Sequence, residues 1–340
     1  KTVVLGNGLK VYLLSDPSFN VSAASVSVEV GSLDNPDERQ GLAHFLEHML
    51  FLGTEKYPDV DEYSSYLKTH GGYSNAYTAS DHTNYQFQVL PDGFEGALDR
   101  FSQFFISPLF TEEYTSREVN AVNSEHQKNM LNDNWRQFRI ASLFAKKGHP
   151  ERKFGTGNLE TLGDISREEL IKFYKQHYSA NRMGIALLST HSLETMESWC
   201  RKYFSLVKNY NLDRNKYDPK FLEEKETFRL VQIDPVKDVR NLNLLFALPG
   251  TRHLYKSKPG RQFGFILGYE GKGSLLSYLK QKGWALSLSA GAGSETSDYG
   301  SASVRIGLTE EGQKNYKKVI KSTMGYIALM KSEGQQKHVF

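Results

Sequence analysis

The 340-residue sequence has few of the features that mark disulfide-bonded, membrane-spanning or nucleic-acid-binding proteins. Its single cysteine, Cys200, excludes an internal disulfide, and the helix-like segment around it favours a small buried side chain. No run of about 18 apolar residues is present, so no membrane span is expected. With a net charge of +3 and 24% charged residues, the chain lacks the basic footprint that nucleic-acid binding requires. We expect a soluble protein of the cytoplasm or the periplasm, and the single cysteine leaves the redox compartment open.

One pentapeptide in the sequence has the spacing of a metal site. Residues 44–48 read His-Phe-Leu-Glu-His inside an apolar, helix-like segment. Residues i and i+4 lie on the same face of a helix, so the imidazoles of His44 and His48 can reach one metal ion. Glu47 lies about 60° around the helix from His44, where it can act on a metal-bound water without being a ligand. This H-x-x-E-H order is the inverzincin signature of zinc hydrolases.

A third ligand has to come from another part of the chain. A catalytic zinc ion takes three protein ligands and keeps one open position. A long helix is predicted over Thr111–Lys147, where Glu118 and Glu125 lie seven residues apart and therefore share one face. Two glutamates on a charged helix are also typical of a solvent-exposed face. The residues alone do not decide which carboxylate is the ligand.

Longer segments around these residues resemble a known family. The sequence resembles the pitrilysin and insulin-degrading-enzyme family of zinc metallopeptidases from Leu9 to the end of the chain. His48 is followed 77 residues later by Glu125, as at the metal site of that family (125 − 48 = 77). The segments that carry the resemblance are residues 41–58, 71–77, 96–101, 117–126 and 153–158.

The resemblance implies one Zn²⁺ ion per chain, held by His44, His48 and Glu125, with Glu47 as the general base. It places Glu118 outside the ligands, where an acid orients a ligand and tunes its basicity. A zinc ion lowers the pKa of its water to about 7 and polarises the scissile carbonyl. The implied activity is that of a zinc endopeptidase, which hydrolyses peptides and small unfolded polypeptides with metal-activated water.

A strand near the motif is a candidate for substrate binding. Gly71–Thr78 reads as a turn that enters a strand, and Asn84–Leu90 alternates apolar and polar residues. An edge strand beside the zinc ion would accept a peptide by backbone pairing. The resemblance places Asn75 and Ala76 on that edge, whereas the residues alone are equally compatible with an ordinary buried hairpin.

Two short matches indicate an internal repeat. Ser65–Lys68 recurs as Ser277–Lys280, and Thr111–Glu113 recurs as Thr309–Glu311, which favours a duplicated unit. The predicted organisation is a catalytic zinc-binding unit, a polar linker and a second homologous, non-catalytic and truncated unit. The corresponding residues are 1–208, 209–226 and 227–340.

The expected fold class is α+β, with antiparallel or mixed sheets and helices packed on one face. Strands are predicted at Leu9–Leu14, Val21–Val30, Tyr73–Thr78 and Asn84–Leu90. Helices are predicted at Pro36–Leu52, Asp59–His70, Asp92–Ile106 and Thr111–Lys147.

The second unit lacks the histidine pair and so cannot bind zinc in the same way. By resemblance it forms a wall of the substrate chamber, with an exosite for the N-terminal end of a peptide. The exosite residues would be Gly268, Glu270, Leu288 and Ala290. Arg261 and Phe265 stand where insulin-degrading enzymes carry histidines, a departure that weakens the expectation of the same peptide preference.

The resemblance also implies partners. Members of the family carry four related units, of which this chain matches the first and about half of the second. Peptide substrates, the C-terminal half of a longer polypeptide and a second copy in a homodimer are the expected partners, and weak activity is expected from this chain alone. The alternative is a catalytically inactive scaffold or peptide-binding subunit of the same fold. Inactive members typically lose part of H-x-x-E-H, whereas this chain keeps all of it.

Overall fold

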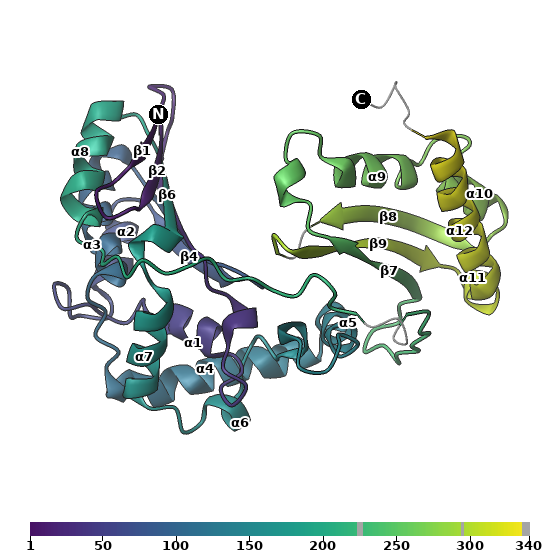
Figure 1. Cartoon of the computed structure of the whole chain (residues 1–340), viewed down its shortest axis with the longest axis horizontal. Coiled ribbons are helices and arrows are strands. Elements are labelled where there is room, and N and C mark those ends of the chain that lie inside the picture. The colour runs from purple at the N-terminus through teal and green to yellow at the C-terminus, as the bar shows by residue number, and fades with distance from the viewer. Residues whose placement is uncertain (223–226, 294–295, 335–340) are drawn as a thin grey trace. The chain divides into compact units, whose positions relative to one another are not determined.

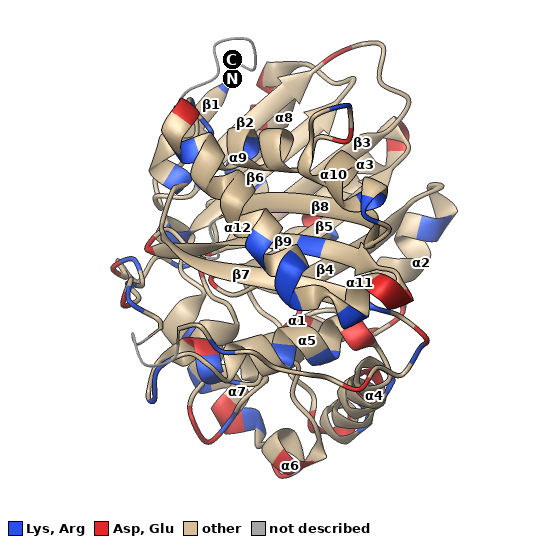
Figure 2. Cartoon of the chain, turned by 90° about the vertical axis from the view of Figure 1, so that its right-hand side faces the viewer, with Lys and Arg blue, Asp and Glu red and all other residues tan. Residues whose placement is uncertain are grey.

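The computed structural model describes residues 1–222, 227–293 and 296–334 of the chain (Figure 1). They form two compact units, one of Lys1–Leu131 with Pro150–Asn215 and one of Asn132–His149 with Lys216–Phe340. The domain boundaries expected from the sequence stay a prediction, and residues 223–226 of the expected linker lie outside the described residues. Among the residues described, no helix combines the length and apolar character of a membrane span. Figure 2 shows Lys and Arg interspersed with Asp and Glu over the elements in view.

The first unit is built on a six-stranded mixed sheet with the order β1-β2-β6-β3-β5-β4. Its strands are β1 (Thr2–Val4), β2 (Lys10–Ser15), β3 (Ser22–Val28), β4 (Tyr73–Thr78), β5 (Thr83–Val89) and β6 (Met183–Ser189). Only β2 and β6 are parallel. The β3–β6 pairing joins residues far apart in sequence, since Val28 lies opposite Met183 (183 − 28 = 155).

Helices cover one face of this sheet. They are α1 (Leu42–Met49), α2 (Glu62–Thr69), α3 (Phe94–Ser102), α4 (Glu112–Met130), α6 (Leu159–Leu162), α7 (Arg167–His177) and α8 (Leu193–Phe204). Alternate strand residues such as Val26 and Tyr85 are fully buried and share one core with Phe45 of α1 and Phe101 of α3. Cys200 of α8 belongs to the same core, as predicted. This arrangement confirms the α+β class.

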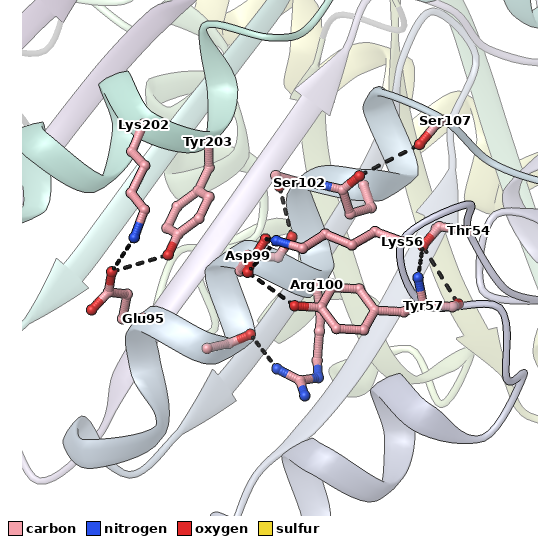
Figure 3. Close-up of polar contacts among 12 residues, drawn as sticks. Thr54, Lys56, Tyr57, Glu95, Asp99, Arg100, Ser102, Ser107, Lys202 and Tyr203 are labelled. Carbon is pink, nitrogen blue, oxygen red and sulfur yellow. Dashed lines mark hydrogen bonds and ion pairs between the residues drawn. The ribbon is translucent and has the colours of Figure 1, made fainter.

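Charged side chains fasten α3 to the loop that follows α1 and to α8 (Figure 3). Asp99 of α3 accepts hydrogen bonds from Lys56 Nζ at 2.6 Å and from Tyr57 Oη at 2.9 Å. Glu95, one turn earlier on α3, accepts a hydrogen bond from Lys202 Nζ of α8 at 3.0 Å. Lys56 and Tyr57 therefore hold the loop after α1 against α3.

Two of the predicted helices differ from those observed. The helix predicted over Pro36–Leu52 begins only at Leu42, because Gly41 has a φ of 96° and ends the preceding turn in a left-handed conformation. The helix predicted over Thr111–Lys147 is two helices, α4 and α5 (Asp133–Ser142). Asn132 separates them: its backbone is extended, and its side chain accepts a hydrogen bond from the first turn of α5. This N-cap lies where the first unit gives way to the second.

The second unit contains an antiparallel sheet with the order β7-β9-β8. Its strands are β7 (Asn241–Pro249), β8 (Ala285–Gly293) and β9 (Tyr299–Leu308), and its further helices are α9 (Pro259–Leu267), α10 (Leu275–Gln281), α11 (Glu310–Lys314) and α12 (Tyr316–Glu333). Leu279 of α10, Ile306 of β9 and Val319 of α12 are fully buried in one core.

The order of these strands repeats that of the first unit, where β3-β5-β4 are neighbours in the same way. Ser65–Lys68 and Ser277–Lys280 lie in the equivalent helices α2 and α10. The match between Thr111–Glu113 and Thr309–Glu311 is wrong, because the second tripeptide follows β9 directly whereas the first follows β5 only after α3. Leu90, which directly follows β5, and Leu308, which ends β9, are the better equivalents.

The described part of the second sheet is an incomplete copy of the first. In the first unit β3 has two neighbours, β5 and β6, whereas β7 has only β9 among the described residues. Asp16 and Asp234, each followed by proline, are 218 residues apart, as are Leu90 and Leu308 (234 − 16 = 218; 308 − 90 = 218). The residues before Asp234 thus correspond to β2, but they form no strand, and Leu230 is 65% exposed.

Candidate metal centre

Helix α1 presents three polar side chains next to one another. Its apolar residues, among them Phe45 and Leu46, are fully buried in the core of the first unit. His44 and His48 lie one turn apart, with ring centroids separated by 4.8 Å. A Cβ at Gly41, just before the helix, would overlap the backbone of Gly157, so the helix starts in close contact with that loop.

The ligand atoms of two histidines and one glutamate converge. Glu125 Oε2 of α4 lies 3.6 Å from His44 Nε2 and 3.9 Å from His48 Nε2. All three ligand atoms lie within 4.8 Å of one another. Zinc–nitrogen and zinc–oxygen bonds of about 2.1 Å at tetrahedral angles place such donors about 3.4 Å apart. The two separations from Glu125 Oε2, 3.6 and 3.9 Å, are within about 0.5 Å of that value, so these three residues form a group that could bind a zinc ion.

The opposite nitrogen of each imidazole has a hydrogen-bond acceptor. His44 Nδ1 lies 2.8 Å from the carbonyl oxygen of Thr156, and His48 Nδ1 lies 3.2 Å from Glu118 Oε2. A hydrogen on each Nδ1 leaves the lone pair of each Nε2 directed toward Glu125. These two contacts assign the tautomer that a metal ligand needs.

The geometry also separates the two glutamates of α4 that the sequence left equivalent. Val119 and Val122 are buried and hold α4 against the core. On the neighbouring face, Glu125 meets both Nε2 atoms, whereas Glu118 meets only Nδ1 of His48. Glu125 therefore belongs to the group of side chains that could bind a metal ion, whereas Glu118 contacts this group only through Nδ1 of His48.

Glu47 lies beside these residues in a buried position. Its side chain is nearly inaccessible, with the residue 6% exposed, and Thr78 Oγ1 of β4 donates a hydrogen bond to its Oε2 at 2.6 Å. Burial is the largest influence and raises the pKa of the Glu47 carboxyl; the Thr78 hydrogen bond and the nearby His44 and His48 oppose that rise. A buried carboxyl group with a raised pKa, next to a group of side chains that could bind a metal ion, makes Glu47 a candidate for a general base.

The surroundings of His48 raise the pKa of its imidazole. Burial, the largest single influence, lowers it, but the hydrogen bond to Glu118 and the charges of Glu47, Glu118 and Glu125 together outweigh burial. The three carboxylates thus favour a positive charge near His48. A divalent cation bound at this place would supply such a charge.

The strand that carries Thr78 is the edge of the first sheet. β4 pairs only with β5, with Asn75 opposite Gln86 and Ala76 opposite Tyr85. Asn75 is exposed and Ala76 packs against the core. One edge of β4 therefore has no strand partner among the described residues. In an ordinary buried hairpin, that edge would be covered.

Two of the residues predicted for the exosite, Gly268 and Glu270, follow α9, and the other two, Leu288 and Ala290, lie on β8. Gly268 directly follows α9 close to the backbone of Ala290 on β8. Glu270 is exposed, but the side chain of Leu288 is buried in the core of the second unit. Leu288 could contact a ligand only through its backbone. Arg261 and Phe265, four residues apart on α9, are both exposed.

Two contacts in the centre were not predicted from the sequence. The Thr156 carbonyl is a backbone group, and any residue type supplies one. Thr78 is the last residue of β4, and its contact with Glu47 depends on how β4 packs on α1. Its only sequence signal is its place in the segment that follows Gly71-Gly72.

Comparisons with known proteins cover the whole chain. Two family profiles match: Insulinase (Peptidase family M16) at residues 10–147 and Peptidase M16 inactive domain at residues 164–339. The insulin-degrading enzyme of Homo sapiens is 44% identical over 343 residues, which cover 99% of this chain and 34% of that protein. The A-factor-processing enzyme of Saccharomyces cerevisiae is 42% identical over 345 residues, which cover 99% of this chain and 34% of that protein.

Solved structures share the fold. Pitrilysin has a TM-score of 0.91 at 29% identity, over 99% of this chain and 37% of that chain. A protease from Helicobacter pylori has a TM-score of 0.81 at 19% identity, over 100% of this chain and 81% of that chain. The chain spans about a third of the length of the curated relatives it matches.

Proposed function

Because the chain belongs to the insulinase family of peptidases (peptidase family M16), we propose that it carries the metal site of a zinc-dependent endopeptidase that hydrolyses peptides and small unfolded polypeptides. The observation that carries this proposal is the convergence of His44 Nε2, His48 Nε2 and Glu125 Oε2 beside the buried carboxyl of Glu47. Three ligand atoms plus one open position is the ligand count of a catalytic zinc site.

In this proposal His44, His48 and Glu125 hold the zinc ion. Glu118 and the Thr156 carbonyl keep each imidazole oriented, because each accepts a hydrogen bond from an Nδ1 atom. A bound zinc ion supplies Lewis-acid chemistry, which acidifies a water molecule and polarises the peptide carbonyl.

Glu47 is the proposed general base. It accepts a proton from the attacking water and returns it to the nitrogen of the leaving amine. Its buried position excludes competing solvent, and the hydrogen bond from Thr78 to Oε2 favours the ionised form that a base requires.

A peptide substrate would pair with the open edge of β4 at Asn75 and Ala76. Backbone hydrogen bonds would then provide most of the affinity, which allows many side-chain sequences. The names of two relatives, an insulin-degrading enzyme and an A-factor-processing enzyme, support small polypeptides as the substrate class. The exposed Arg261 and Phe265 on α9 would give the second unit its own preference among such peptides.

The experiment that tests the proposal compares Glu47→Gln with the unaltered protein. We expect one zinc ion per chain in both, measured by atomic emission. Cleavage of a fluorogenic peptide should fall at least about 100-fold, because the base is lost while the metal ligands remain. Glu113→Gln, at an exposed position of α4, is the matched control. A Glu47→Gln protein that cleaves at the normal rate would show that Glu47 is not the base.

His48→Ala separates this function from a metal-free, peptide-binding scaffold. The proposal expects that the variant loses both zinc and cleavage. A protein that binds peptide but contains no zinc before any substitution would instead support the scaffold.

A further inference from the structure

The edge strand β4 contacts the proposed base through one hydroxyl group. Thr78 is the C-terminal residue of β4, and its Oγ1 lies 2.6 Å from Glu47 Oε2. Hydrogen bonds from a hydroxyl to a carboxylate have lengths of about 2.5–2.7 Å, shorter than those between neutral groups. The Glu47 Oε1 atom accepts no hydrogen bond from the residues that the structure describes.

The contacts of a second threonine show which atom is the donor in the hydrogen bond between Thr78 and Glu47. Thr83 lies directly opposite Thr78 in the β4–β5 pairing, with the two Oγ1 atoms 3.5 Å apart. The Thr83 hydroxyl donates its hydrogen to the carbonyl oxygen of Val30 at 2.8 Å. Because that hydrogen is already engaged and an ionised carboxylate has none, the Thr78 hydroxyl is the donor to Glu47.

We propose that Thr78 is a positioning residue for Glu47, which holds Oε2 by its hydroxyl and leaves Oε1 directed to the water that attacks the peptide. This inference rests on the proposed role of Glu47 as the base. A carboxyl group held at one oxygen cannot rotate freely, so the other oxygen keeps one orientation during proton transfer. Since Thr78 ends the strand on which a peptide would pair, one strand sets both the position of the peptide and the orientation of the base.

The test uses the protein at its native length and compares Thr78→Val with Thr78→Ser. Valine keeps the shape of threonine but removes the hydroxyl, whereas serine keeps the hydroxyl. We expect Thr78→Val to lower kcat about 10- to 100-fold, a part of what a general base contributes, with KM within about twofold. Zinc content should stay at one ion per chain, and Thr78→Ser should keep kcat within about threefold. If the valine variant does not fold, Thr78→Ala compared with Thr78→Ser makes the same distinction.

Thr115→Val is the matched control. It removes another buried threonine hydroxyl, one that donates to the Thr111 carbonyl within α4, and should leave kcat unchanged. A second readout does not need catalysis: in a Glu47→Gln background, adding Thr78→Val should leave the Kd of a fluorescent peptide unchanged, measured by anisotropy. A role in strand structure alone would weaken that binding.

The outcomes distinguish the two proposals. A normal kcat in Thr78→Val, an equal loss in Thr78→Ser, or weakened peptide binding would overturn the positioning role of Thr78. If Glu47→Gln is inactive while Thr78→Val is normal, the proposed function stands and only this inference fails. If Glu47→Gln cleaves at the normal rate, the proposed function fails as well.

Discussion

The supporting position of Glu118 leads to a quantitative prediction about zinc affinity. Glu118 Oε2 lies 3.2 Å from His48 Nδ1 and does not face the two Nε2 atoms, so its removal leaves all three ligands in place. Its side chain is only 16% exposed, so water does not replace it fully. Loss of such a partner lowers metal affinity about 10- to 100-fold, which corresponds to about 1.4–2.7 kcal/mol. We predict this loss for Glu118→Ala, and a smaller one for Glu118→Gln, which keeps an acceptor oxygen.

The assay is competition for zinc with a chromophoric chelator at constant pH. Glu113→Ala, five residues earlier and exposed on α4, serves as the control for changes in helix charge and should bind as the unaltered protein does. Glu125→Ala should lose far more affinity than Glu118→Ala, because it removes a ligand. Equal losses at the two positions would refute the division into ligand and support, and an unchanged affinity in Glu118→Ala would refute the role of its hydrogen bond.

Three further predictions concern stability and activity. Burial, assisted by the charge of Arg182, lowers the pKa of His177 to about 4, so its contribution to stability is full above about pH 6.5 and is lost as the pH falls toward 4. Between pH 7.5 and 5 this loss is about 2 kcal/mol, and urea unfolding of His177→Gln should lack that part of the pH dependence. Gly41→Ala should destabilise by more than about 2 kcal/mol in thermal unfolding, because it adds a clash with Gly157 to the strain of a positive φ. Gly71→Ala has a positive φ without that clash and should cost less. The 340-residue chain alone should cleave a peptide far more slowly than a polypeptide that also contains a C-terminal part of the kind its relatives carry, and equal rates would contradict the expected dependence on such a part.

The sequence was sufficient for the part of the centre that lies on one helix. His44, Glu47 and His48 keep their mutual positions because helical geometry relates residues three and four apart. The residues by themselves could not choose between Glu118 and Glu125, since both share one face of α4 and differ only in how α4 crosses α1. Family resemblance assigned them before the geometry did.

Other features depended on local signals or on contacts across the fold. The break between α4 and α5 had a visible signal, because Asn132-Asp133 is a typical start of a helix. The contact of Thr78 with Glu47 had only the weak signal of Thr78's place after Gly71-Gly72, since sheet register and packing bring together residues 31 positions apart. The β-sheet order was likewise unpredicted, because β6 reaches β3 across more than 150 residues.

The pairing of β3 with β6 has a consequence for how the protein is made. Both helices that carry the proposed zinc ligands, α1 and α4, lie in the long stretch of chain between these two strands. Pairing between strands so far apart in the sequence is slow. During synthesis, β6 has to be made before the sheet can form around the proposed metal site. A zinc ion bound by side chains of both α1 and α4 would join these two helices within the stretch between β3 and β6. Because the ion would bind the folded arrangement, it would favour pairing of the two strands by mass action. Metal supply during synthesis would then affect the yield of folded protein as well as its chemistry.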